Sequence, residues 1–292
     1  MAGAGGRDEG TLCLLWNLNS FDGKGGGMRG CVAFFLASIW LAAVAEAEVR
    51  ILTCEEPPTN FMEEGELRGM TVEIVRAIRD RLGIYDEIEI LPWARAYRIA
   101  KREPGVVIFT CAITSERVAH GFHFVGPVTT RRYVLWMKRG AGIGLSDIGE
   151  ITERGLSLGT VRGDWRARYF EDRGFRVEKA VTHGKALRML LRERFDLWII
   201  SDLEGPVVAG RIGVPADSIE IAHVFMEGAS YIMLSRGTPE ETVNRWKQAF
   251  TDLGKTDFFR KGAEKWRRVL GLNIRYAREK GYFVAPATPT VE

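Results

Sequence analysis

The chain has 292 residues, of which 46% are hydrophobic and 27% are charged, and its formal net charge is only +3. This composition is typical of a globular protein with ample apolar content for a core, and the length suits one large domain or two lobes. Lysine and arginine are scattered among acidic residues instead of forming a dense basic block, so the sequence does not favour nucleic-acid binding.

The first 47 residues do not have the pattern of a folded domain. Residues 1–27 are glycine-rich, and Met28 opens a segment with one positive charge, an apolar run of about fifteen residues and the small-x-small ending Ala45-Glu46-Ala47. We expect an N-terminal extension and signal peptide over 1–47, with Met28 as the start and cleavage after Ala47. An uncleaved membrane anchor is the alternative, although a span needs about twenty apolar residues.

Export would place the mature protein in an oxidising compartment with two cysteines, Cys54 and Cys111. Each follows an expected strand, over 49–53 and 106–110. If these strands are neighbours in one sheet, the cysteines lie close enough for a disulfide, which needs Cα atoms within about 7 Å. Two free thiols are the alternative, and the residues alone leave both open.

From residue 48 onward, strand and helix patterns alternate, which predicts a mostly parallel α/β sheet. The helix over 71–82 has apolar residues at a spacing close to 3.6, with Thr71 as its cap and Gly83 as its stop. Residues 61–69 are expected to form a loop, and the polar segment from 273 a loosely held tail. Strands are expected at 49–52, 88–91, 106–109, 133–137, 156–161, 175–181, 195–200 and 230–234, and further helices from 93, over 168–173, 183–194 and 254–270, and from 239.

The stretch over 106–127 is the most informative part of the chain. Its apolar strand ends in small hydroxyl residues and Arg117, a common arrangement for an anion pocket beyond the carboxyl end of a strand. The planar fork of a guanidinium suits a carboxylate held by two hydrogen bonds. A helix cap or a surface ion pair is the alternative role of Arg117. A second apolar segment over 122–125 is expected to stop at Gly126-Pro127.

Other motifs argue against a cofactor, a metal site or a hydrolase. The glycine run over 140–144 lacks the G-x-G-x-x-G spacing of a dinucleotide site. No G-x-S-x-G or H-E-x-x-H motif is present, and the histidines have no metal-ligand spacing. We therefore expect no cofactor, no metal and no enzyme activity. The four histidines are His120, His123, His183 and His223.

The chain resembles the bacterial extracellular solute-binding proteins of family 3, the amino-acid-type periplasmic binding proteins. The resemblance rests on an ordered set of short pieces between residues 48 and 270. These are residues 49–51 through 57–58, Leu67-Arg68-Gly69-Met70-Thr71-Val72-Glu73-Ile74, Thr114-Ser115-Glu116-Arg117 with Phe124 and Pro127, Val161-Arg162-Gly163, Phe195-Asp196, and Leu234-Ser235-Arg236-Gly237-Thr238-Pro239.

The resemblance implies a type II fold of two α/β lobes, each a mostly parallel sheet flanked by helices, joined by two crossing strands and closing around ligand. Lobe 1 would cover 48–130, lobe 2 131–226, and 227–272 would return to lobe 1, followed by the tail over 273–292. It also implies a periplasmic monomer that delivers its ligand to a membrane ABC permease.

The resemblance also assigns the site. Arg117 falls where family members grip the ligand carboxylate, and Thr110 and Ala112 fall at neighbouring strand-end positions. The turn of Gly163, Asp164, Trp165 and Arg166 matches the segment that donates from lobe 2.

Some positions depart from the family pattern. The acidic partner for an α-amino group falls at Ser201, and Asp202 is one place off, which on a strand end turns it to the other face. Glu55 or Glu56 would then supply the missing negative charge. An apolar part of the ligand would pack on Trp93, Tyr97 or Trp165, for which a core position is the alternative.

We therefore expect a periplasmic protein that captures a small carboxylate-containing solute, an amino acid or a related compound. The alternatives are a lyase of the cyclohexadienyl-dehydratase kind on the same fold, with Glu55, Glu56 and Arg117 as its acid/base site, and a periplasmic sensor module.

Overall fold

The structure is a computed structural model that describes residues 49–286. These residues belong to one compact unit. The expected translation start, signal peptide and cleavage point lie outside the described residues. Within 49–286 we find no helix with the length and apolar character needed to cross a membrane.

A sheet of ten strands runs through the described part of the chain, with the order β4-β1-β5-β10-β6-β9-β7-β8 and β12 attached to β6. Three strands at each end are parallel, and β6 and β10 are antiparallel to each other. The strands are β1 (Arg50–Thr53), β4 (Ile88–Ile90), β5 (Val106–Ala112), β6 (His123–Lys138), β7 (Leu158–Val161), β8 (Val177–Ala180), β9 (Leu197–Ser201), β10 (Ile219–Leu234), β11 (Ile274–Ala277) and β12 (Gly281–Val284).

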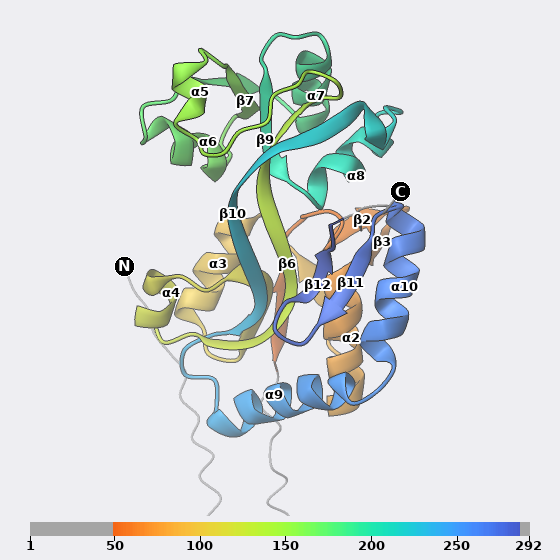
Figure 1. Cartoon of the computed structure of the whole chain (residues 1–292). Helices are drawn as coiled ribbons and strands as arrows, with labels where there is room; N and C mark the ends of the chain where they lie inside the picture. Colours follow the sequence, from red (N-terminus) through yellow and green to blue (C-terminus); the bar gives the residue numbers. More distant parts are fainter. Residues whose placement is uncertain (1–48, 287–292) are drawn as a thin grey trace, which may run out of the picture. The chain divides into compact units, whose positions relative to one another are not determined.

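Helices pack around both ends of this sheet and divide it into two lobes (Figure 1). Lobe 1 contains β1, β4 and β5 with α2 (Met70–Leu82), α3 (Trp93–Arg102), α4 (Ser115–Ala119), α9 (Glu240–Gly254) and α10 (Phe258–Leu270). Lobe 2 contains β7, β8 and β9 with α5 (Glu150–Glu153), α6 (Trp165–Glu171), α7 (His183–Leu191), α8 (Glu204–Arg211) and the short helix η1 (Ala216–Ser218). The two-lobe α/β fold expected from the sequence is confirmed.

The two lobes are joined by β6 and β10, each of which runs through both lobes (Figure 1). The sequence predicted that the apolar segment over 122–125 stops at Gly126-Pro127 and that a separate strand begins at 133. Instead, one strand covers both segments. The pairing of β6 with β10 shifts register between Ser230 and Ile232, opposite Pro127. Such an irregularity accommodates a proline, which has no backbone N–H to donate.

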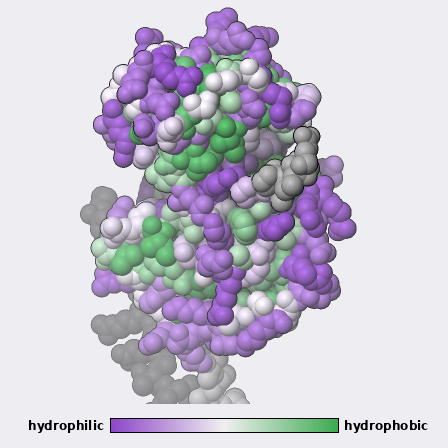
Figure 2. Space-filling model, viewed as in Figure 1, coloured by the Kyte–Doolittle hydropathy of each residue, from purple (hydrophilic) through white to green (hydrophobic). Residues whose placement is uncertain are grey.

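Each lobe has its own buried apolar clusters. Those of lobe 1 bring α2, α9 and α10 against β1 and β5, and those of lobe 2 surround β7 and β9. The outer surface in Figure 2 is mostly hydrophilic, and hydrophobic residues on this face gather in the lower part of the upper lobe and the upper left of the lower lobe.

The segment over 61–69, expected to be a loop, is a hairpin of β2 (Phe61–Glu63) and β3 (Glu66–Arg68). Helix α2 then begins without the side-chain cap that Thr71 was expected to provide. Its first amides donate instead to the carbonyls of Pro58 and Thr59. A Cβ at Gly69 would lie 2.1 Å from the Thr59 carbonyl oxygen, so this close approach requires glycine.

The C-terminal segment also differs from the expectation of a tail held loosely from residue 273. Strands β11 and β12 form an antiparallel hairpin, and β12 pairs with β6 through Tyr282 and Thr129. The Tyr282 side chain is only 2% exposed and packs edge-on against Phe259 of α10. The prediction of a loose tail was wrong because this segment is mostly polar, and only a few aromatic residues anchor it to the rest of lobe 1.

We predict that Tyr282→Ala lowers the free energy of unfolding by about 3–5 kcal/mol, because it leaves a cavity between the hairpin and α10. Urea denaturation followed by circular dichroism measures this change. Phe283→Ala, at the half-buried neighbouring position, is the control and should cost clearly less. A loss below about 1 kcal/mol for Tyr282→Ala would contradict the anchoring role.

Candidate functional site

Arg117 lies in α4, directly beyond the carboxyl end of β5. Its backbone N–H donates to the Thr114 hydroxyl, which caps the helix. The guanidinium donates to the Ala112 carbonyl and lies over the rings of Trp93 and Tyr97, with its carbon 5.0 and 5.3 Å from their centroids. The side chain is half-buried, so aromatic packing orients the guanidinium without enclosing it.

Thr110 occupies an unusual backbone position in β5. Its φ is +66°, in the left-handed region that β-branched residues avoid, and it falls at the irregularity where β5 and β10 lose register. Its hydroxyl donates to Asn60 Oδ1 over 2.6 Å, and the Asn60 amide donates to the Cys54 carbonyl. Thr110 therefore ties the end of β5 to the loop that follows β1, so its hydroxyl is already engaged.

The loop after β1 contributes Glu56 to the junction between the lobes. This loop is closed by backbone hydrogen bonds between Glu56 and Asn60 in both directions. Glu56 accepts a hydrogen bond from Arg131 Nη1, on the crossing strand β6. Glu55, in contrast, is exposed and makes no side-chain hydrogen bond or ion pair with any residue in 49–286.

The turn before α6 forms a closed ionic unit in lobe 2. Gly163 has φ +82°, a conformation that favours glycine, and Asp164 caps α6 through the Arg166 amide. Arg166 Nε and Nη2 hold the two oxygens of Asp164 at 2.8 and 2.7 Å. Both side chains are only 6% exposed, whereas Trp165 is 48% exposed. Trp165 is therefore the available side chain of this turn.

At the end of β9, Ser201 and Asp202 point in different directions, as the alternation of side chains predicts. Asp202 accepts from the Arg132 backbone N–H and from its Nε, at 3.0 and 2.8 Å. The Ser201 hydroxyl donates to Glu204 Oε2 over 2.7 Å. Asp202 thus fastens β9 to β6, and Ser201 leads instead to another carboxylate, Glu204.

Glu204, at the first residue of α8, connects the lobe 2 residues into one network. Its Oε2 also accepts from Arg166 Nη1 over 2.8 Å. Burial alone raises the pKa of the Glu204 carboxyl, but the charges of Arg166 and Arg131 and the hydrogen bond from Ser201 outweigh burial and lower this pKa to about 2. Burial raises the pKa of Glu56, because Arg131 offsets it only in part.

Three residues of this network were missed from the sequence: Arg131, Tyr133 and Glu204. Arg131 and Tyr133 are two positions apart on β6, so they share a face. The Tyr133 ring lies 5.0 Å from that of Trp165 and 5.9 Å from the Arg166 guanidinium. The available signal was the pair of consecutive arginines just before the strand expected at 133–137, because alternation along an extended segment turns the two side chains to opposite faces.

The two cysteines are close in the fold, since β1 and β5 are parallel neighbours, which meets the condition that the sequence left open. Both are free thiols in the structure, so the alternative without a disulfide is the one observed. Burial, with the charge of Glu56, raises the pKa of Cys54 to about 12, and burial also raises the pKa of Cys111. Neither thiol is therefore activated as a nucleophile.

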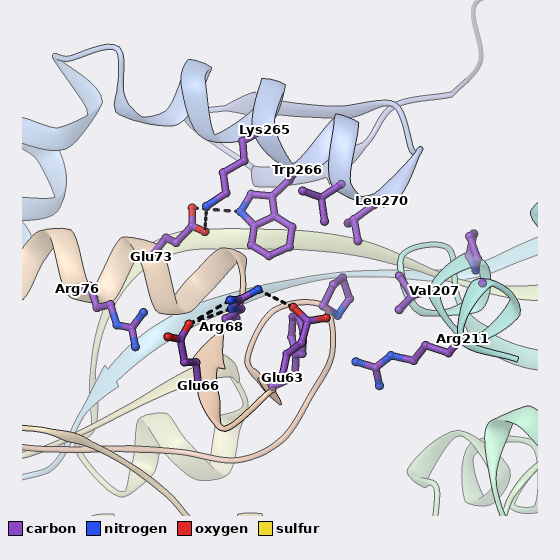
Figure 3. Close-up of a pocket in the computed structure, with 15 residues that line it drawn as sticks. Glu63, Glu66, Arg68, Glu73, Arg76, Val207, Arg211, Lys265, Trp266 and Leu270 are labelled. Atoms are coloured by element: carbon purple, nitrogen blue, oxygen red, sulfur yellow. Dashed lines mark hydrogen bonds and ion pairs between the residues drawn. The ribbon is translucent and has the colours of Figure 1, made fainter.

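A separate pocket of about 610 Å³ lies between the β2–β3 hairpin, α2, α10 and α8 (Figure 3). None of the residues expected to bind ligand lines it. Several of its charged groups are paired with each other: Lys265 Nζ and Trp266 Nε1 both donate to Glu73, and Arg68 donates to Glu63 and Glu66. Because none of the expected ligand-binding residues lines this pocket, we place the candidate site at the network of Glu56, Arg131, Arg166, Ser201 and Glu204.

Comparison with known families assigns the fold. Residues 49–281 match the model of the bacterial extracellular solute-binding proteins, family 3. The chain belongs to this family.

Within 49–286, no three side chains of His, Cys, Asp or Glu are grouped so as to hold a metal ion. Comparison with curated protein sequences finds no match for this solute-binding protein.

Solved structures share its fold at low sequence identity. One is a histidine kinase sensor domain with similarity to periplasmic binding proteins, with 18% identity, a TM-score of 0.60, and coverage of 75% of this chain and 95% of that chain. A mutant of ArgBP from T. maritima has 17% identity, a TM-score of 0.60, and coverage of 76% and 96%. An ABC uptake transporter substrate-binding protein from Streptococcus pneumoniae with bound histidine has 19% identity, a TM-score of 0.59, and coverage of 75% and 92%.

We predict that Glu204→Gln destabilises the protein at pH 7 by about 3 kcal/mol, since the folded pKa of about 2 lies well below the ordinary value of about 4.3. A lowered carboxyl pKa stabilises the folded state above the unfolded pKa, and this contribution is lost as the pH falls towards the folded pKa. The difference between the variant and the native sequence should therefore shrink to about half by pH 3.

Urea denaturation at pH 7, 5, 4 and 3 measures this dependence. Glu193→Gln removes a carboxylate from an exposed ion pair with Lys138 and is the control, with an expected change of less than about 1 kcal/mol. A Glu204→Gln difference that stays constant between pH 7 and pH 3 would exclude the ionic role of Glu204.

Proposed function

We propose that the protein works in the periplasm, where it captures a small carboxylate-containing solute, an amino acid or a related compound, between its two lobes. It then delivers this solute to an ABC importer in the membrane. The observation that carries this proposal is the placement of Arg117 beyond the carboxyl end of β5, with its guanidinium oriented by Trp93, Tyr97 and the Ala112 carbonyl. A half-buried guanidinium with donors left over suits a carboxylate.

Lobe 2 contributes to capture through Trp165 and through Glu204. The exposed ring of Trp165 is available for packing against a guest. Ser201 stands where the resemblance puts the acidic partner of a ligand amino group, and Glu204 brings a carboxylate next to it. The Glu204 Oε1 makes no hydrogen bond within the described part of the chain. This arrangement supports binding of a cationic amino group opposite the carboxylate on Arg117.

Closure would select the form in which both lobes contact the guest. The lobes already touch, because Leu203 of the β9–α8 connection is buried in the core cluster of lobe 1. The crossing strands β6 and β10 are the elements about which the lobes would rotate. Family membership supports a binding protein, and delivery to a membrane permease is the transport role we propose for it.

We predict that Arg117→Ala weakens ligand binding by at least about 2 kcal/mol, or about thirtyfold, because a charged hydrogen-bond partner is lost. Thermal-shift screening against amino acids, dicarboxylates, opines and polyamines first identifies a ligand. Calorimetry then compares the variant with Arg98→Ala, an exposed position on α3 with no ion pair in 49–286. Equal affinities of Arg117→Ala and Arg98→Ala for the ligand would contradict the proposed role of Arg117.

Incubation with prephenate or arogenate separates a carrier from a lyase on the same fold. We predict saturable binding or no binding, without product, when the reaction mixture is followed by liquid chromatography. Heat-inactivated protein is the control. Product formation that is abolished by Glu56→Gln would instead support an acid/base enzyme and overturn the transport proposal.

A further inference from the structure

Arg131 has donors that the folded protein leaves unused. The side chain is 3% exposed and only its Nη1 is paired, with Glu56. Its Nε and Nη2 are buried and have no hydrogen-bond partner in the described part of the chain. A charged donor left unpaired in a buried position destabilises the fold, so natural proteins rarely retain one without a use.

The unused donors form one edge of the guanidinium. Nε and Nη2 are the pair that holds a carboxylate through two parallel hydrogen bonds. The same edge is filled elsewhere in this chain: Arg166 holds Asp164 through it at 2.8 and 2.7 Å, and Arg50 holds Glu89 at 2.6 and 3.0 Å. In Arg131 no residue of the described part of the chain accepts a hydrogen bond from this edge, although the Glu204 carboxylate is near enough to interact with its charge.

Arg131 also lies at the junction between the lobes. It shares a face of β6 with Tyr133, whose ring contacts the exposed Trp165 of lobe 2. Its partner Glu56, from lobe 1, has a side chain that is 31% exposed, so the group borders solvent. The neighbouring Arg132 points to the other face, where its backbone N–H and its Nε donate to Asp202.

We infer that Arg131 is a second ligand-binding guanidinium, and that the solute is a diacid whose second carboxylate occupies the Nε and Nη2 edge. This inference rests on the proposed function, in which Arg117 holds the first carboxylate. It adds a specificity-determining residue on the crossing strand, where no sequence motif of the family pointed.

The charges near Arg131 are compatible with this assignment. Before ligand binds, Arg131 and Arg166 face three carboxylates, those of Glu56, Asp164 and Glu204. A further carboxylate on Arg131 therefore favours proton uptake by Glu56, whose carboxyl already has a raised pKa. A diacid that also carries an amino group adds one positive charge, so an acidic amino acid fits the site better than a simple dicarboxylate.

Calorimetry with isosteric pairs tests the inference, because each pair differs only in a carboxylate against an amide. The probes are L-glutamate with L-glutamine, and glutarate with glutaramate. We expect the acid of at least one pair to bind about tenfold or more tightly than its amide. Arg131→Lys keeps the charge but loses the planar fork, and should remove most of this preference while changing the affinity for the amide by less than about threefold.

Arg50→Lys removes the corresponding fork at the exposed edge of lobe 1 and should leave all affinities unchanged. The double variant Glu56→Gln/Arg131→Gln removes both charges of the pair, so it leaves no unpaired buried charge. If it keeps its thermal midpoint but loses the preference for the acids, misfolding cannot explain that loss. No preference for the acids in the native protein, or a preference that survives Arg131→Lys, would overturn the inference.

Failure of the two proposals can be distinguished. If the native protein binds the amides as well as the acids and Arg117→Ala weakens both, the proposed function stands and the role of Arg131 is wrong. If Arg117→Ala has no effect while Arg131→Lys removes the acid preference, Arg131 binds a carboxylate and the role of Arg117 is wrong. Absence of binding to all four probes overturns the diacid assignment.

Discussion

The structure depends on the antiparallel pairing of β6 and β10, which extends from Lys138 opposite Ile219 to His123 opposite Leu234. This ribbon is the shared framework of both lobes (Figure 1). Because side chains alternate along a strand, it also separates two neighbouring arginines. Arg132 connects β6 to the end of β9 by donating to Asp202, whereas Arg131 faces the junction of the lobes. One constraint on the backbone thus assigns different roles to identical residues.

The loop after β1 fixes the other half of the Glu56–Arg131 pair. Asn60 binds the Cys54 carbonyl and the Thr110 hydroxyl, and Gly69 allows α2 to start directly against the same loop. A buried ion pair gives little net stability, because desolvation of both charges offsets their attraction. Its value here is positional: it sets the direction in which the remaining donors of Arg131 point.

Local patterns predicted the parts of the fold that local physics determines. The apolar spacing of α2, its stop at Gly83, and the predominance of parallel strands were all readable from the sequence. The site was only partly readable. Arg117 follows from a motif, but Glu56 and Arg131 are 75 residues apart and Arg166 and Glu204 are 38 apart. Such partners are set by the sheet order, which periodicity does not reveal.

The distribution of satisfied and unsatisfied groups then decides what each lobe offers to a guest. The lobe 2 turn saturates its own charges, since Arg166 is held by Asp164 and Glu204, so it presents mainly the Trp165 ring. The donors left over belong to Arg117 in lobe 1 and to Arg131 on the crossing strand. A guest between the lobes would therefore meet positive charge from Arg117 and Arg131, and from lobe 2 the Glu204 carboxylate and the aromatic surface of Trp165. In the proposed function, closure would add apolar contact with Trp165 to these polar contacts, and the closed form would be favoured when a guest contacts both lobes.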